Sequence, residues 1–88
     1  MSLYADCADH LYATIFYSDK NDYIRTECNI ERIIETMLLF LDYSDMIEIV
    51  TERVIPKLEQ RKFKNRELWF DFFNRKISFW KECADIVK

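Results

Sequence analysis

The sequence predicts an all-α fold, a compact bundle of about four helices, and three observations support that prediction. The 88 residues include no glycine and one proline, whereas hairpin turns, β-bulges and left-handed helix caps depend on glycine. Apolar residues recur at helical spacing in four segments, and short polar links separate these segments. Because a chain of this length buries only one modest core, we expect residues 1–88 to form a single helical domain.

The first predicted helix covers about residues 3–17. Ser2 is its expected cap, because a serine hydroxyl accepts a hydrogen bond from a backbone N–H of the first turn. A polar break over residues 18–22 follows, made of residue types that favour turns. The apolar face of this helix consists of Tyr4, Ala8, Leu11 and Ile15, with Cys7, Tyr12 and Phe16 beside it.

The second predicted helix covers about residues 23–43, and Asn29 is an alternative cap for a shorter helix. Residues 37–41 are apolar on all sides, which is typical of a central helix or of one that a partner covers. Leu39 and Phe40 lie off the main apolar stripe, so they are candidates for an apolar interface. The stripe itself consists of Ile30, Ile33, Ile34, Met37, Leu38 and Leu41.

The third predicted helix begins at residues 44–45. Asp45 and Glu48 have the spacing of a capping box, with Asp in place of Ser or Thr. Pro56 lies inside the apolar pattern and has no backbone N–H, and its ring crowds the preceding turn. We therefore expect this helix to be kinked or broken at the proline. Its apolar face consists of Ile47, Val50, Val54 and Leu58.

The last predicted helix covers about residues 66–87, after a basic link over residues 60–65. Asn65 is its expected cap. The stripe of this helix is strongly aromatic, and such a stripe is more often core than a binding groove. It consists of Trp69, Phe73, Ile77, Trp80 and Ala84.

The sequence contains no recognisable catalytic machinery, so we expect a protein that is not an enzyme. His10 is the only histidine, and the chain lacks the glycines of phosphate-binding loops and dinucleotide fingerprints. Cys7 and His10 share one helix face, and Cys28 and Cys83 would complete a tetrahedral zinc site. No second short-spaced pair supports that interpretation. We therefore expect no bound metal and no cofactor.

The cysteine count and the apolar runs favour a cytoplasmic protein with reduced thiols. Three cysteines at wide spacing do not suggest a disulfide framework. The first ten residues contain two aspartates and no Lys or Arg, so we expect no secretory signal. The longest apolar run, residues 37–41, is too short to span a bilayer, so we expect no membrane partner. The abundance of Ile, Lys, Tyr and Phe is what A/T-rich codons produce, which is compatible with a viral or phage source.

Charge is distributed unevenly along the chain. Residues 1–52 contain 11 acidic and 3 basic side chains, and residues 53–88 contain 5 acidic and 10 basic side chains, for a net charge of −3. Two charged surfaces are candidate sites for a partner. The acidic face consists of Glu27, Glu31 and Glu35 at helical spacing. The basic stretch consists of Lys57, Arg61, Lys62, Lys64 and Arg66, with Phe63 interleaved.

Four interpretations of these charges remain open. The acidic face pairs with Lys57, Arg61 or Lys64 of the same chain, or with the basic stretch of a second copy in a homodimer. Alternatively, the acidic face binds a basic host protein, or the basic stretch binds nucleic acid. We expect a protein–protein interaction module, an adaptor, inhibitor or subunit that self-associates. The alternative is a small nucleic-acid-binding or transcription-regulating protein that uses residues 57–66, although an acidic net charge opposes it.

Overall fold

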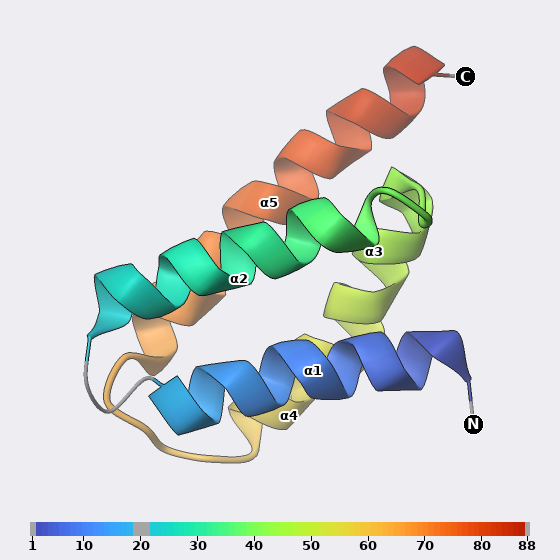
Figure 1. Ribbon diagram of the computed structural model, residues 1–88. Helices are drawn as coiled ribbons and strands as arrows, with labels where there is room; N and C mark the ends of the chain where they lie inside the picture. The colour runs from blue at the N-terminus through green and yellow to red at the C-terminus, as the bar shows by residue number, and fades with distance from the viewer. Residues whose placement is uncertain (1, 19–21, 88) are drawn as a thin grey trace.

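Four helical rods make up the part of the chain that the computed structural model describes, residues 2–18 and 22–87 (Figure 1). No strand occurs in these ranges. The third rod is built from three joined pieces, so the predicted four-helix all-α fold is confirmed. The elements in chain order are α1 (Leu3–Ser18), α2 (Tyr23–Met37), α3 (Tyr43–Ile49), the π-helical segment η1 (Val50–Val54), α4 (Ile55–Glu59) and α5 (Arg66–Val87).

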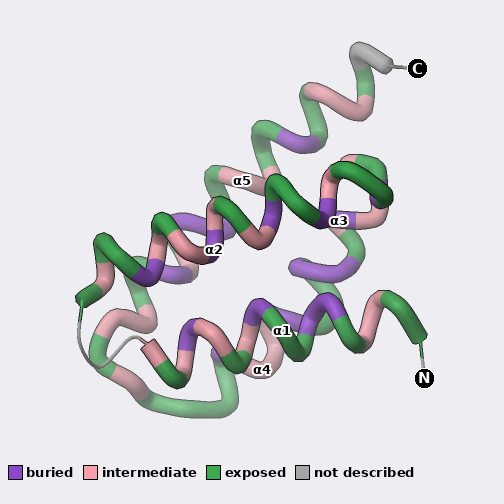
Figure 2. The backbone as a smooth tube through the Cα atoms, viewed as in Figure 1, coloured by how far each residue is buried: buried purple, intermediate pink, exposed green. Residues whose placement is uncertain are grey.

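The predicted apolar faces of the four rods meet in one core (Figure 2). The largest fully buried side chains, Trp69, Phe73 and Trp80, all come from α5. The Trp69 ring lies edge-on to Phe72, with 5.2 Å between the centroids, in a favourable aromatic geometry. The aromatic stripe of α5 is therefore core. Other buried apolar residues are Cys7, Ala8, Leu11, Ile15, Ile30, Ile34, Met37, Leu41, Met46, Ile49, Val50, Val54, Leu58 and Phe72.

Side-chain caps mark the starts of α1 and α2. The Ser2 hydroxyl accepts a hydrogen bond from the Ala5 N–H at 3.0 Å, as the sequence predicts. The Asp22 carboxylate accepts from two backbone N–H groups in the first turn of α2. The longer form of the second helix is therefore correct at its start, and Asn29 lies within the helix rather than at its cap.

The link between α2 and α3 differs from the prediction. α2 ends at Met37, about six residues before the expected end, and residues 38–40 form a turn. The capping box of α3 is made by Asp42 and Asp45, each accepting from the backbone N–H of the other at 2.8 and 3.0 Å, rather than by Asp45 and Glu48. The predicted box was wrong by one turn, because the apolar run over residues 37–41 favoured a longer helix than the chain forms.

The kink predicted at Pro56 takes the form of a π-helical turn. The Ile55 N–H donates to the Val50 carbonyl, five residues earlier, instead of to the carbonyl four residues earlier. Pro56 then lies in the first turn of α4, where the absence of an N–H removes no bond from the new α-helix. The third helical rod therefore continues through Pro56.

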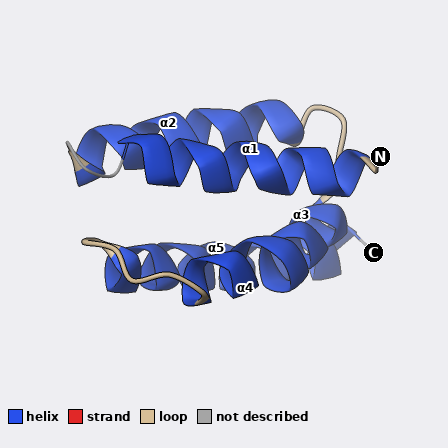
Figure 3. Ribbon diagram, turned by 90° about the horizontal axis from the view of Figure 1, so that it is seen from below, coloured by secondary structure: helices blue, strands red, loops and turns tan. Residues whose placement is uncertain are grey.

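The rods form two layers (Figure 3). α1 and α2 lie antiparallel in one layer, and α3, α4 and α5 lie in the other (Figures 1 and 3). Between the layers, α1 packs against α3 and η1, and within the second layer α3 packs against α5. The turn after α2 lies at one end of the molecule, and the link over residues 60–65 lies at the opposite end (Figures 1 and 3).

Candidate functional site

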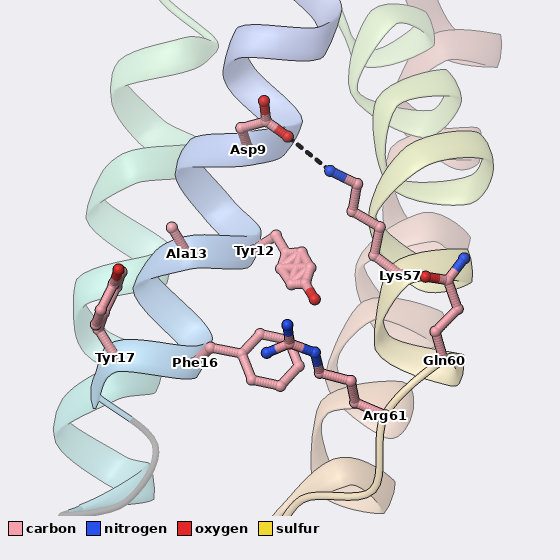
Figure 4. Close-up of a pocket in the computed structure, with 8 residues that line it drawn as sticks. All are labelled: Asp9, Tyr12, Ala13, Phe16, Tyr17, Lys57, Gln60 and Arg61. Atoms are coloured by element: carbon pink, nitrogen blue, oxygen red, sulfur yellow. Dashed lines mark hydrogen bonds and ion pairs between the residues drawn. The ribbon is translucent and has the colours of Figure 1, made fainter.

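A cleft of about 580 Å³ opens between the C-terminal half of α1 and the end of α4 (Figure 4). Tyr12 and Phe16 are one helical turn apart on α1, so both rings point to the same side, and across the cleft Lys57 on α4 and Arg61, just after α4, point toward them (Figure 4). We call this site the aromatic–basic cleft. It is lined by Asp9, Tyr12, Ala13, Phe16, Tyr17, Lys57, Gln60 and Arg61.

Both cations of the cleft lie over aromatic rings. The Arg61 Cζ is 5.0 Å from the centroid of Phe16 and 6.0 Å from that of Tyr12, and the Lys57 Nζ is 5.1 Å from the centroid of Tyr12. The rings of Tyr12 and Phe16 are 4.5 Å apart, and Phe63 lies 4.8 Å from Phe16 on the other side. A guanidinium that rests on ring faces keeps its N–H edges available for an anion. The rings therefore hold Arg61 in place without using its hydrogen-bond donors.

The two cations differ in their charge partners. The Lys57 Nζ makes an ion pair with the Asp9 Oδ1 at 2.8 Å (Figure 4). Among the described residues, no carboxylate makes an ion pair with Arg61. The cleft therefore has one neutralised end and one cationic end, and the cationic end is the chemically available one.

The basic stretch divides into two groups in the structure. Lys57 is paired with Asp9, and Arg66 donates from Nη2 to the Glu59 carbonyl at 3.2 Å while its guanidinium lies 5.2 Å from the Phe70 ring. Lys57 and Arg66 therefore make contacts within the chain. The other three residues, Arg61, Lys62 and Lys64, are exposed to solvent, and Arg61 lines the cleft.

The acidic face packs beside α5 rather than beside the basic stretch. The two carboxylate oxygens of Glu31 lie 2.6 and 2.8 Å from the Lys76 Nζ. Glu27 is half-buried and lines the same shallow depression as Arg75, whereas Glu35 is exposed. The intramolecular partner of Glu31 is therefore Lys76, and not one of the partners that the sequence suggested, Lys57, Arg61 or Lys64.

Leu39 and Phe40 are exposed at the turn after α2, as expected for an interface candidate. We call this pair of residues the apolar turn. Phe40 also lines an apolar groove of about 370 Å³ between α1 and α2. The other residues that line this groove are Asp6, Cys7, His10, Arg32, Ile33, Thr36 and Met37.

The three cysteines lie in different surroundings and form no disulfide: Cys7 is buried, Cys28 is exposed and Cys83 is half-buried. Burial, with a smaller contribution from the charge of Asp6, raises the pKa of the Cys7 thiol, which disfavours the reactive thiolate. Within residues 2–18 and 22–87, no three His, Cys, Asp or Glu side chains are placed to hold a metal ion together.

A hydrogen bond joins the two layers near the start of α1. The Tyr4 hydroxyl donates to the Asp45 carboxylate, which is also part of the capping box of α3. This bond, followed by burial and nearby carboxylates, raises the pKa of Tyr4 to about 12. The same bond, together with those from Asp42, lowers the pKa of Asp45. The neutral Tyr4 hydroxyl and the ionised Asp45 carboxylate, which together form this bond, are therefore both favoured around neutral pH.

The sequence predicted the basic wall of the cleft as a candidate site but did not predict its aromatic wall. Lys57 and Arg61 belong to the predicted basic stretch, whereas Tyr12 and Phe16 were placed beside the apolar face of the first helix. An aromatic pair at i and i+4 on the edge of that face is the one sequence signal for this wall, and it does not say which helix lies opposite.

Comparison with known protein families, with curated proteins and with solved structures finds no match to this chain. Over the described residues, every helix is too short or too polar to cross a membrane. Function is therefore inferred from the surfaces of the chain itself.

Proposed function

We propose that the protein is a non-enzymatic protein–protein interaction module and that the aromatic–basic cleft binds its protein partner. The observation that carries this proposal is Arg61, which lies over Phe16 and Tyr12 with no carboxylate partner among the described residues. Tyrosine and arginine are enriched among the residues that dominate binding energy at protein interfaces. A partner segment with an acidic residue beside an apolar one would place a carboxylate against Arg61 and an apolar side chain against the rings.

Nucleic acid is the second candidate partner, because Arg61 lies over aromatic rings and two more exposed cations, Lys62 and Lys64, follow it in the chain. Two features favour a protein instead. Asp9 places a carboxylate inside the cleft, and the whole chain has a net charge of −3. A patch of this size neutralises only about three phosphates, so its binding to nucleic acid would be weak at physiological salt.

A peptide display experiment tests the proposal directly. The immobilised protein is used to select from a random peptide library, and selected peptides are titrated by fluorescence anisotropy at physiological salt. We expect enrichment of peptides in which Asp or Glu adjoins Leu or Phe. Arg61→Glu should weaken their binding by about tenfold or more, which corresponds to about 1.4 kcal/mol. Lys81→Glu, a charge reversal at an exposed position of α5 outside the cleft, is the matched control.

Parallel titrations with single-stranded oligonucleotides separate the two candidates. Sub-micromolar oligonucleotide binding that Arg61→Glu abolishes would replace the proposed function with the nucleic-acid alternative. A library that yields no peptide dependent on Arg61 would remove the cleft as a protein-binding site.

The proposal includes a cytoplasmic location with free thiols. It is supported by the separation of Cys7, Cys28 and Cys83, which form no disulfide in the structure. Native mass spectrometry of protein purified without chelator should give the mass of the bare chain. Alkylation should modify exposed Cys28 before buried Cys7. A stoichiometric zinc ion or an intermolecular disulfide would contradict this part of the proposal.

A further inference from the structure

The apolar turn is an exposed hydrophobic feature with acidic neighbours. Phe40 is 58% exposed, and Leu39 is more exposed still. Glu35 and Asp42, on either side of these residues, are also exposed. Exposed carboxylates thus lie five residues before and two residues after Phe40 along the chain, so the turn combines apolar and acidic side chains, as proposed above for a partner of the cleft.

The aromatic–basic cleft has the complementary character. Its α1 wall offers the rings of Tyr12 and Phe16, and its other wall offers the Arg61 guanidinium. Lys62 and Lys64 extend the positive charge into the adjoining link and have no ion-pair partner among the described residues. An apolar side chain flanked by carboxylates would meet rings and cations at once.

These two surfaces cannot meet within one molecule. The apolar turn lies at the end where α2 leads to α3, whereas Gln60 and Arg61 of the cleft begin the link that runs to the opposite end (Figures 1 and 3). The whole molecule is about 39 Å long. A second molecule is therefore needed to bring the complementary surfaces together.

We infer that the partner of the cleft is a second copy of this chain, with the apolar turn of one copy bound in the aromatic–basic cleft of the next. The inference rests on the proposed function of the cleft. Phe40 packs against the rings of Tyr12 and Phe16, and the carboxylates beside it face the exposed cations. Phe40 supplies most of the affinity because an aromatic side chain removes a large apolar area from water, and the charges set the orientation.

The two surfaces lie at opposite ends of the molecule, so the inferred contact places successive copies head to tail, which is a heterologous arrangement. It differs in this respect from the two-fold homodimer expected from the sequence, in which one patch is used twice. Each assembly leaves one unoccupied turn and one unoccupied cleft at its ends, so further copies add until a ring closes. The contact is small compared with a standard interface of about 800 Å² per partner, so the association is weak and depends on concentration.

Two variants, each lacking one surface, provide the test. Phe40→Asp disrupts the apolar turn and leaves the cleft intact. Arg61→Glu disrupts the cleft and leaves the apolar turn intact. By sedimentation velocity, the wild-type protein should increase in mass with concentration beyond a dimer. Each variant alone should remain at 10.8 kDa. An equal mixture of the two variants should form a heterodimer of twice that mass and no larger species, because each supplies the surface that the other lacks.

Phe79→Asp is the matched control for Phe40→Asp. Phe79 is 55% exposed, which is close to the value for Phe40, and it belongs to neither surface. This control should self-associate like the wild-type protein. Circular dichroism of every variant checks that the helices form. Leu39→Asp and Lys62→Glu repeat the test with a second pair of exposed positions, should either first variant lose its fold.

The outcomes separate the inference from the proposed function. A wild-type protein that stays monomeric at millimolar concentration overturns the inference, and the proposed function survives if selected peptides still bind through Arg61. A species that stops at a dimer, lost in Phe40→Asp and not restored by mixing, also overturns the inference in favour of a two-fold contact. If there is neither self-association nor peptide binding through Arg61, both are wrong.

Discussion

The contact between α2 and α5 and the cleft between α1 and α4 contain the same chemical groups and use them differently. Each has a carboxylate paired with a lysine whose Nζ lies over an aromatic ring, at 5.6 Å from Phe72 in the first and 5.1 Å from Tyr12 in the second. In the α2–α5 contact the Lys76 and Glu31 side chains are 26% and 34% exposed, and in the cleft the Lys57 and Asp9 side chains are 44% and 63% exposed.

The two regions differ most in what remains unpaired. In the α2–α5 contact the ring of Phe72 is core and the lysine binds both carboxylate oxygens. In the cleft the rings of Tyr12 and Phe16 are only partly buried, and Arg61 has no carboxylate partner among the described residues. The same groups therefore stabilise the fold where packing covers them and remain available to a partner where it does not.

The largest expected difference between the two regions is in the stability lost when an aromatic ring is removed. Phe72→Ala should destabilise the protein by about 3–5 kcal/mol, because it leaves a cavity in the core. Tyr12→Ala should cost no more than about 1 kcal/mol, because its ring already contacts water. Urea unfolding followed by circular dichroism measures both. Equal losses of unfolding free energy for the two variants would mean that the cleft is part of the core.

A smaller effect is expected at the two ion pairs. Double-mutant cycles with Glu31→Gln and Lys76→Met, and with Asp9→Asn and Lys57→Met, give the coupling energy of each pair. We expect about 0.5–1 kcal/mol for the half-buried pair and less than about 0.5 kcal/mol for the more exposed one, each decreasing with added salt. A larger coupling for Asp9 and Lys57 would reverse the roles assigned to the two regions.

The smallest effect concerns pH and the bond between the layers, outside both regions. The pKa of Asp45 is lowered in the fold, so the stability that its bond with Tyr4 provides is present above the ordinary carboxyl value of 3.8 and is lost as pH falls through the folded-state pKa. The pKa of Tyr4 is raised to about 12, so the same stability is present below 10.0 and lost as pH rises toward 12.

Tyr4→Phe removes this bond and keeps the ring. Its unfolding free energy should lie below that of the wild-type protein at pH 7, and the difference should shrink as the pH is lowered from 5 to 3. Spectrophotometric titration should also show one tyrosine in the wild-type protein that ionises after the others and is missing from the variant. A difference in stability that stays constant over the acidic range would assign it to packing rather than to Asp45.

The fold was largely predictable because it depends on spacing along the chain. The positions of Trp69, Phe73 and Trp80 determine the buried face of α5, and Pro56 determines where the third rod departs from α-helical geometry. The end of α2 was not predictable in the same way. Residues 38–41 are apolar whether they continue a helix or form a turn, and only the pairing of Asp42 with Asp45 decides between the two.

The candidate site was predictable only in part, because it depends on which helices are neighbours. The positions of Arg61 and Lys57 in the basic stretch follow from the sequence, but their position opposite Tyr12 requires α4 to pack beside α1. Likewise, the partner of Glu31 is set by the way α5 passes α2. The charge pattern of the sequence identifies the groups that need partners, whereas the packing of the core determines which groups become neighbours.

The π-helical turn of η1 determines in which direction the side chains of α4 point relative to those of α3. Each residue turns an α-helix by about 100°, so the extra residue accommodated before Pro56 determines which way α4 faces. Without it, Lys57 on α4 would be rotated by that angle away from α1, and the chain would enter the link at Arg61 in a different direction. A residue in a segment that does not line the cleft thus decides where the cationic side of the cleft points, and deletion of Thr51 would misdirect the site without removing a single group from it.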